Sequence, residues 1–238
     1  MAPSKRSVNN QYIGYITLQY DAEADAVSLG DYGYRSVGEV GTAYDKTVEA
    51  VVADYARRLV TMLPTLAVSG VTVSSKYDYA EYTAQVMLRA FGADYSCGNY
   101  GGLRGTGGVT AGQPINEANL YEVIPFDNTV YLLRLRGRTI YRIYTENEDN
   151  WYFGAAAGVP NPDELAYDDT LYTFAVIDYV YTGTYFSGYR SAVLQEDETG
   201  IILRDLLVAD VKAHGDAGAR WTYADGAMLE PVDWSKGG

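Results

Sequence analysis

A glycine-rich stretch at residues 97–108, CGNYGGLRGTGG, contains the residue types that can hold an anion. Its arginine, Arg104, has a forked set of donors that can engage phosphate oxygens in pairs. Glycine lets backbone N–H groups approach a negative charge closely and form a nest around it. The stretch therefore predicts a ligand-binding loop. The alternative is a tight turn that serves the fold alone, with Arg104 in a surface salt bridge.

Residues that could hold a metal ion or act as a nucleophile are scarce, because the chain has one histidine, His214, and one cysteine, Cys97. Zinc and iron hydrolases usually need several imidazoles, and cysteine-based zinc sites and disulfides need more than one thiol. We therefore expect no catalytic residue, metal site or cofactor on this chain. His214 is expected near the end of a helix capped by Gly215, as a favourable C-terminal charge.

The chain is acidic, since 18 Lys and Arg against 31 Asp and Glu give a formal net charge of −13. This charge repels phosphate backbones and anionic membrane surfaces, so we expect no nucleic-acid partner. The acidic runs at 146–150 and 196–200 lack the pattern of a calcium loop and are expected to be solvated loops. No window approaches the roughly 18–20 apolar residues of a membrane span, so none is expected.

The first residues, MAPSKRSVNNQ, are basic but lack the apolar core of a secretory signal. They indicate either a cytoplasmic protein or a trimmed piece of an exported one. Tyrosine is unusually frequent, with 24 residues against 5 Phe and 3 Trp. Its ring stacks and its hydroxyl forms hydrogen bonds, which suits base or sugar binding and protein interfaces. The alternative is that these tyrosines are strand residues at half-buried positions.

Hydrophobic periodicity predicts an α+β fold, with strands and helices mixed along the chain. Residues 12–20 alternate as a half-buried strand does, and residues 79–90 carry apolar side chains along one helical face. Further helices are expected at 45–63, at 115–124 with Asn116 as the cap, at 138–148 and at 201–215; further strands at 26–37, 66–75, 93–97, 129–137, 171–181 and after Arg220; and a loop at 150–168.

Three motifs follow one another in a recognisable order: NYGGLR at 99–104, VIPFDNTV at 123–130 and LRGRTI at 135–140. With the helix before them, they resemble the C-terminal domain of the 5′-nucleotidase family over roughly residues 43–215. The resemblance implies that family's α+β fold, with mixed sheets and three main helices.

The N-terminal strands resemble the end of the same family's metallophosphatase domain, so the resemblance divides the chain into residues 1–42 and 43–238. The rest of that domain, with its dinuclear metal centre, has no counterpart in this sequence. We therefore do not expect this chain to be a hydrolase by itself, although it can be part of a 5′-nucleotidase-type phosphohydrolase.

The family's C-terminal domain supplies substrate specificity, and its site residues carry over by motif. The resemblance implies that Arg104 meets phosphate and that Asn99 is the asparagine of the same motif. Phe126 matches an aromatic residue that stacks on one face of the base, and Tyr179 matches the aromatic residue on the other face. These four residues are the predicted ligand-binding site.

Several departures from the family pattern predict a degenerate site. Tyr100 replaces the first motif glycine and is expected to add bulk beside the ligand, and Tyr185 replaces the acidic residue that would hold a ribose hydroxyl. Lys76 and Glu81 stand in altered positions before the glycine-rich loop, without the family's arginine. Asp127 is expected to bring a negative charge towards the slot, which disfavours phosphate.

Three functions remain open at this point. The first is a catalytically incomplete 5′-nucleotidase C-terminal-like domain that binds a nucleotide, nucleoside or sugar, or that serves assembly. The second is the specificity half of a nucleotide-hydrolysing metallophosphatase whose catalytic domain lies on another chain or has been removed. The third is a tyrosine-rich structural subunit that packs against further copies of itself.

Overall fold

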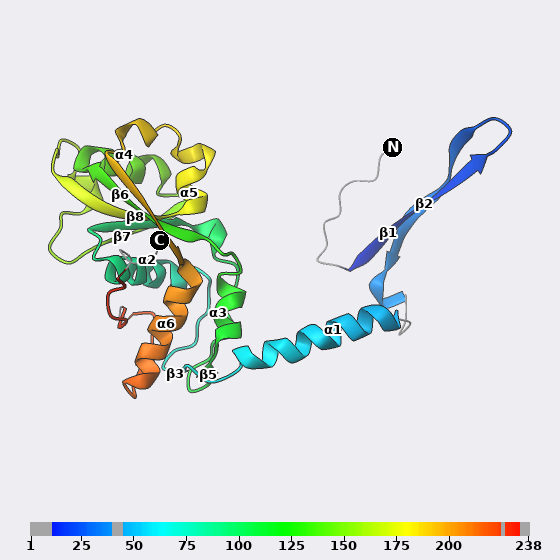
Figure 1. The fold of residues 1–238 in the computed structure, drawn as a ribbon, viewed down its shortest axis with the longest axis horizontal. Helices are drawn as coiled ribbons and strands as arrows, with labels where there is room; N and C mark the ends of the chain where they lie inside the picture. The colour runs from blue at the N-terminus through cyan, green and yellow to red at the C-terminus, as the bar shows by residue number, and fades with distance from the viewer. Residues whose placement is uncertain (1–10, 40–44, 225–226, 234–238) are drawn as a thin grey trace. The chain divides into compact units, whose positions relative to one another are not determined.

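The computed structural model describes residues 11–39, 45–224 and 227–233. Contacts divide the chain into two units, residues 1–58 and residues 59–238. The first unit contains the strands β1 (Tyr12–Asp21) and β2 (Ala26–Ser36), which pair antiparallel, and then the helix α1 (Lys46–Leu59) (Figure 1). These elements confirm the two strands and the helix predicted from the alternation and periodicity of this part of the sequence.

The β1–β2 hairpin gathers most of its large apolar side chains on one face, while Ile13 lies on the other, opposite Arg35. Its register pairs Ile16 with Tyr32 and Leu18 with Leu29, and cross-strand partners share a face. The register shifts between these pairs and leaves Gly30 as an extra residue, which keeps the apolar positions of β2 in phase with those of β1. One face therefore carries eight large apolar or aromatic side chains, each 47–70% exposed: Tyr12, Ile16, Leu18, Tyr20, Val27, Leu29, Tyr32 and Tyr34.

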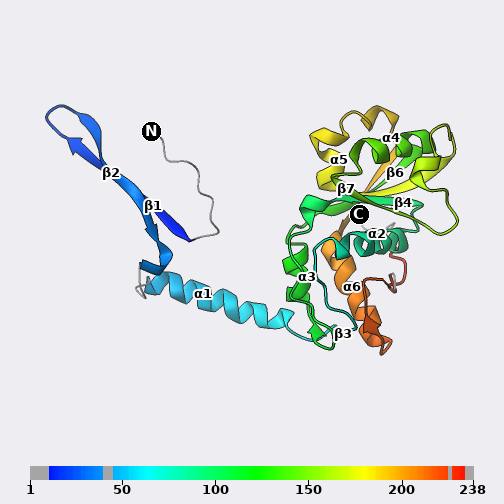
Figure 2. The same cartoon turned by 180° about the vertical axis from the view of Figure 1, so that it is seen from behind.

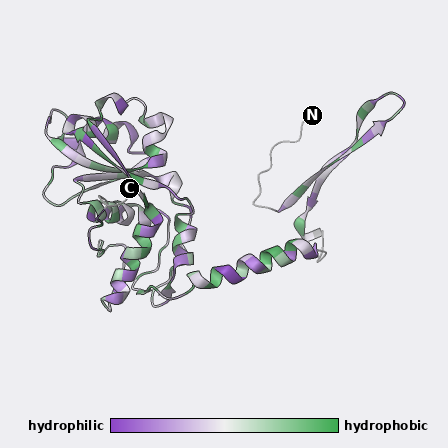
Figure 3. Cartoon of the chain, viewed as in Figure 1, coloured by the Kyte–Doolittle hydropathy of each residue, from purple (hydrophilic) through white to green (hydrophobic). Residues whose placement is uncertain are grey.

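Helix α1 is amphipathic, but none of its residues is buried. Figure 3 shows apolar and polar residues alternating along it. Asp45 caps its N-terminus by accepting hydrogen bonds from the backbone N–H groups of Thr47 and Val48, and these bonds lower the pKa of Asp45. Its apolar face is 51–61% exposed and consists of Val48, Val51, Val52, Tyr55 and Leu59.

The second unit is built on two sheets. The larger has the strand order β7-β4-β8-β6-β9, in which β4 and β8 are parallel and every other neighbouring pair is antiparallel. The smaller has the order β10-β3-β5. The strands are β3 (Ala67–Ser69), β4 (Tyr95–Asn99), β5 (Pro114–Ile115), β6 (Thr129–Arg136), β7 (Trp151–Ala155), β8 (Leu171–Ile177), β9 (Gln195–Ile202) and β10 (Arg220–Trp221).

Helices cover both faces of the five-stranded sheet. Helix α2 (Asp78–Phe91) packs on one face, against β4, β7 and β8, while α4 (Gly137–Asn147) and α5 (Asp178–Thr182) lie on the other (Figures 1 and 2). Helix α6 (Leu203–Asp216) packs against α2 and against α3 (Glu117–Val123). The core lies between α2 and the sheet, and α2 alone contributes ten buried residues. The α+β fold with mixed sheets is thus confirmed, and α1, α2 and α6 are its longest helices.

Most of the remaining predicted elements are confirmed, including the cap of α3. The side chain of Asn116 accepts from the backbone N–H of Asn119, while the Asn119 side chain accepts from the N–H of Asn116, which forms a capping box. The strand expected at 66–75 is shorter, since β3 covers only Ala67–Ser69. The strand expected at 171–181 ends at Ile177, where α5 begins.

Three predictions about the secondary structure were wrong. Residues 150–168 were expected to be a loop, but Trp151–Ala155 forms β7, because it pairs with the distant strand β4. The acidic run at 196–200 was expected to be a solvated loop, but it lies in β9, an edge strand whose charged side chains reach solvent. Gly215 does not cap α6, which continues to Asp216; a Cβ at Gly215 would lie 1.9 Å from the carbonyl oxygen of Leu66.

Candidate functional site

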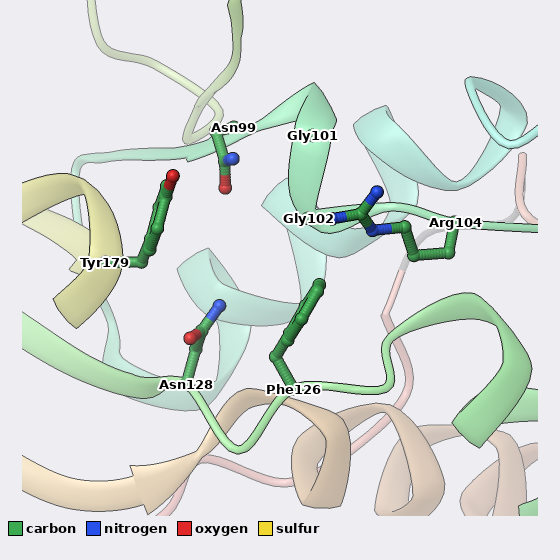
Figure 4. Close-up of a pocket in the computed structure, with 7 residues that line it drawn as sticks. All are labelled: Asn99, Gly101, Gly102, Arg104, Phe126, Asn128 and Tyr179. Carbon is green, nitrogen blue, oxygen red and sulfur yellow. The ribbon is translucent and has the colours of Figure 1, made fainter. Parts of the chain in front are cut away.

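A cavity of about 270 Å³ opens at one edge of the five-stranded sheet (Figure 4). It contains all four residues predicted from the motifs, which come from three separate segments. Asn99 and Arg104 lie on or after the end of β4, Phe126 lies between α3 and β6, and Tyr179 lies in α5. The full lining is Asn99, Gly101, Gly102, Arg104, Phe126, Asn128 and Tyr179. Their part in ligand binding remains a prediction.

Strand topology explains why these segments meet. Strands β4 and β8 are parallel, and β6 runs antiparallel to β8, so the ends of β4 and β8 share an edge with the start of β6. Asn99 is the last residue of β4, Asn128 precedes β6 directly, and Tyr179 follows β8 by two residues. Asp178 links two of these segments, because its carboxylate accepts from the Thr129 hydroxyl at 3.4 Å and from the Tyr179 backbone N–H at 2.6 Å.

The glycine-rich loop is shaped around the Asn99 side chain. A Cβ at Gly101 would lie 3.1 Å from Asn99 Nδ2, and a Cβ at Gly102 would lie 3.0 Å from Asn99 Oδ1. Glycine at both positions therefore lets the loop fold closely over the amide. Asn99 Oδ1 is buried and has no hydrogen-bond partner within the part of the chain that the structure describes. A buried acceptor without a partner is rare in proteins, and it singles out Asn99 within this loop.

Two aromatic rings form the sides of the cavity. Figure 4 shows Phe126 and Tyr179 on opposite sides of it, with the amides of Asn99 and Asn128 between them. Phe126 is 38% exposed and Tyr179 is 65% exposed, so both rings remain accessible. Asn128 belongs to the VIPFDNTV motif but was not predicted as a site residue; its position two residues after Phe126 was the available signal.

Arg104 stacks on Phe126 instead of pairing with a carboxylate. Its Cζ lies 5.1 Å from the centre of the Phe126 ring, a cation–π contact. Arg104 forms no ion pair within residues 11–39, 45–224 and 227–233. The surface salt bridge considered as the alternative for Arg104 is therefore not observed in these residues. The guanidinium therefore keeps its donors available at the edge of the cavity.

Two of the expected obstacles to a ligand do not occur. Tyr100 does not line the cavity; its ring packs edge-on against Tyr77 and Tyr152, with centroids 5.3 and 5.8 Å away. Asp127 is 2.5 Å from the buried guanidinium of Arg204, which balances its charge. The bulk expected from Tyr100 beside the ligand is therefore wrong, and the negative charge expected from Asp127 is paired with a cation far along the sequence.

The other departures from the expected pattern, Lys76, Glu81 and Tyr185, do not line this cavity. Lys76 donates to the carbonyl oxygen of Tyr100 at 3.0 Å, so it supports the loop backbone. Glu81 lies in the first turn of α2. Tyr185 is 82% exposed and lines a neighbouring cavity that also includes Tyr179.

The single cysteine and histidine are both buried. Cys97 lies in β4, and burial raises the pKa of its thiol, which disfavours the reactive thiolate. His214 lies in the last turn of α6, where its Nδ1 is 3.0 Å from the carbonyl oxygen of Asp210. It is 1% exposed and packs within the core, and its expected position near the end of a helix is confirmed.

The described ranges offer neither a metal cluster nor a membrane span. Residues 11–39, 45–224 and 227–233 contain no group of three or more His, Cys, Asp or Glu side chains placed to hold a metal ion. Within the same ranges, every helix is too short or too polar to span a bilayer.

Comparison with known proteins gives one family and a set of related folds. Residues 69–159 match the family described as 5′-nucleotidase, C-terminal domain. A 5′-nucleotidase precursor from Thermus thermophilus is similar at 16% identity and a TM-score of 0.58, over 94% of this chain and 50% of that one. A 5′-nucleotidase-like protein from Staphylococcus aureus, solved with α-ketoglutarate, is similar at 14% identity and a TM-score of 0.58, over 93% of this chain and 50% of that one.

This chain therefore spans about half the length of those solved structures, and at this identity the likeness establishes the fold. No curated protein matches the sequence.

Proposed function

We propose that this chain, whose residues 69–159 match the 5′-nucleotidase C-terminal domain, binds a nucleotide in the cavity at the edge of the five-stranded sheet. The base lies between the rings of Phe126 and Tyr179, and Arg104 engages the phosphate. The observation that carries the proposal is the facing pair of aromatic rings, from segments 53 residues apart, with polar amides between them.

The slot fits a planar ring better than an extended chain. Stacking on aromatic side chains contributes roughly 1–3 kcal/mol per base in proteins that bind single strands. Asn99 and Asn128 offer both donors and acceptors between the rings, which suits the polar edge of a base or a ribose hydroxyl. An oligosaccharide could stack on the two rings but has no phosphate to accept hydrogen bonds from Arg104. A nucleotide can therefore contact more of the residues that line the cavity.

Arg104 supplies the preference for phosphate. Its cation–π contact with Phe126 is weak enough to exchange for paired hydrogen bonds to a phosphate, which contribute on the order of 1.5–3 kcal/mol. A nucleoside monophosphate should therefore bind more tightly than the nucleoside without the phosphate.

Isothermal titration with AMP, adenosine, a UDP-sugar and an oligosaccharide tests the proposal. AMP is expected to bind most tightly, Phe126→Ala and Tyr179→Ala to weaken AMP and adenosine alike, and Arg104→Ala to weaken only AMP. Tyr167→Ala and Arg142→Ala serve as controls, because Tyr167 is 98% exposed and Arg142 lies over the ring of Tyr189, away from the cavity lining. Wild-type affinity for AMP in all three cavity variants would exclude this slot.

A second part of the proposal concerns catalysis. We infer that the domain works as the specificity part of a phosphohydrolase, together with a metallophosphatase domain that contacts the N-terminal unit. The apolar face of the β1–β2 hairpin supports this, because an isolated hairpin with such a face is marginally stable in water and needs a cover. The solved relatives carry a further half of chain that this sequence does not span.

The catalytic part is tested by nucleotide hydrolysis with and without an added metallophosphatase domain and divalent metal. We expect no turnover by this chain alone and turnover when the partner domain is supplied. Analytical ultracentrifugation of the chain alone distinguishes the competing function, since self-association of the hairpin faces at rising concentration would favour a structural subunit.

A further inference from the structure

We propose that Arg204 is the positioning residue of the aromatic slot: from the start of α6 it fixes the backbone at 124–127, and thereby aims Phe126 at Tyr179. This rests on the proposed nucleotide site but concerns a residue that lies outside the cavity lining. Phe126 is 38% exposed and lies outside the hydrophobic core, and the ring contact that the structure gives it is the cation–π contact with Arg104, itself an exposed side chain. With so little packing of its own, the direction of its ring depends on the backbone that carries it.

The contacts of Arg204 converge on that backbone. One terminal nitrogen, Nη1, donates to the carbonyl oxygens of Ile124 and Phe126, both at 3.2 Å. The other, Nη2, donates to the carboxylate of Asp127 at 2.5 Å. The guanidinium carbon lies 3.6 Å from the centre of the Tyr121 ring, so the planar group is stacked as well as hydrogen-bonded.

The residue before Arg204 extends the same support. The backbone N–H of Leu203 donates to the carbonyl oxygen of Asn128 at 2.9 Å. The first two residues of α6 therefore hold acceptors at positions 124, 126, 127 and 128, a segment that carries two cavity-lining side chains, Phe126 and Asn128.

Burial makes this arrangement specific for arginine. Arg204 is 4% exposed, so each of its donors needs a partner and its charge needs a counter-ion. Asp127 supplies that counter-ion and is itself mostly exposed. A lysine could donate to one or two of these acceptors, but it lacks the planar fork that reaches all three and stacks on Tyr121.

The test uses variants that separate positioning from charge. The double variant Arg204→Met with Asp127→Asn removes the ion pair and leaves the net charge of the chain unchanged. The matched control is Arg142→Met with Glu146→Gln, since Arg142 also pairs with a carboxylate and lies over a tyrosine, on the surface of α4. For each variant, AMP and adenosine affinities are measured by titration, and hydrogen exchange is measured over residues 121–130.

The double variant is expected to bind AMP and adenosine more weakly by the same factor, roughly tenfold, because stacking is lost and the phosphate contact is not. Exchange over 121–130 should rise in the same variant. Arg104→Ala should instead weaken AMP alone. The surface control should change neither affinity nor exchange.

Wild-type affinities in a folded double variant would overturn the proposal, even with raised exchange. If the double variant does not fold, Arg204→Lys is used in its place. Its affinities for AMP and adenosine should fall by one common factor, and unchanged affinities would overturn the proposal. If wild-type protein binds neither AMP nor adenosine, the proposed function fails, and exchange over 121–130 then supports or overturns the positioning role by itself.

Discussion

Helices α1 and α2 have the same length, 14 residues, and both are amphipathic, yet α2 buries ten residues and α1 buries none. The same contrast separates the strands of the two units. Leu133 and Phe174 in the five-stranded sheet are fully buried, whereas Leu18 and Leu29 of the hairpin are 62% and 58% exposed. Helix and strand patterns thus form in both units, but among the described residues it is those of 59–238 whose apolar faces are buried.

This comparison indicates which unit can be stable by itself. Most helical stability in proteins comes from packing of the apolar face, and an isolated hairpin is marginal in water. Residues 59–238 therefore carry the cooperative core and the candidate site, whereas the described residues of the unit at 1–58 bury no side chain of their own. The predictions that follow test this division, in order of decreasing effect.

Alkaline pH should unfold residues 59–238 entirely. Burial, followed by nearby acidic groups, raises the pKa of Tyr79 and Tyr82, and burial also raises the pKa of Tyr152. Above the usual tyrosine pKa of about 10, the unfolded chain binds fewer protons than the folded one, so stability falls as pH rises. Absorbance at 295 nm reports ionisation of any of the 24 tyrosines, so the part of its rise that reports the buried ones should coincide with one cooperative change in tryptophan fluorescence. Ionisation of these tyrosines without unfolding would contradict their burial.

A cavity in α2 should destabilise the core far more than the same truncation in α1. Met87→Ala is expected to lower the free energy of unfolding by about 2–5 kcal/mol, because Met87 is fully buried. Val52→Ala, at a position 61% exposed, should change it by less than about 0.5 kcal/mol. Urea unfolding followed by the fluorescence of Trp151 and Trp221 measures both. Equal losses in the two variants would mean that α1 is covered in solution.

Loss of a buried hydrogen bond should lower the free energy of unfolding more than loss of an exposed one between the same residue types. Tyr82 donates to the carboxylate of Asp210, which also accepts from the backbone N–H of Leu229 at 2.8 Å. Tyr82→Phe leaves this buried carboxylate short of a donor and should lower the free energy of unfolding by about 1–3 kcal/mol. Tyr20→Phe is the control, since Tyr20 donates to the exposed Asp25 at 2.8 Å, and it should have almost no effect. Urea unfolding measures both, and equal effects would contradict the difference in burial.

The sequence predicted elements whose signal is local. The apolar spacing of α2 and the capping residue Asn116 of α3 both describe neighbours along the chain, and both were confirmed. Strand β7 was missed because five residues between turn signals become a strand only through pairing with β4, more than 50 residues away. Strand β9 was missed because an edge strand can carry charges that elsewhere indicate a loop.

The candidate site shows the same limit. Asn99, Arg104, Phe126 and Tyr179 were found through motifs, and strand topology brings them to one cavity. The sequence could not show that Arg204, 77 positions after Asp127, balances its charge, or that Tyr100 turns towards Tyr152. Both depend on side-chain directions that arise only from tertiary packing.

The smallest effect is expected on the exposed face of the hairpin, and it tests the division most directly. Leu18→Ser with Leu29→Ser removes a cross-strand pair from the apolar face. Because Leu18 and Leu29 are exposed and do not belong to the hydrophobic core, tryptophan-detected unfolding should be unchanged within about 0.5 kcal/mol. Binding of the dye ANS, which reports exposed apolar surface, should fall.

Gln19→Ser, on the polar face of the same hairpin, is the control and should leave both readouts unchanged. A clear loss of core stability in the double variant would show that the hairpin packs on the second unit, and the apolar face would then be unavailable to a catalytic partner domain.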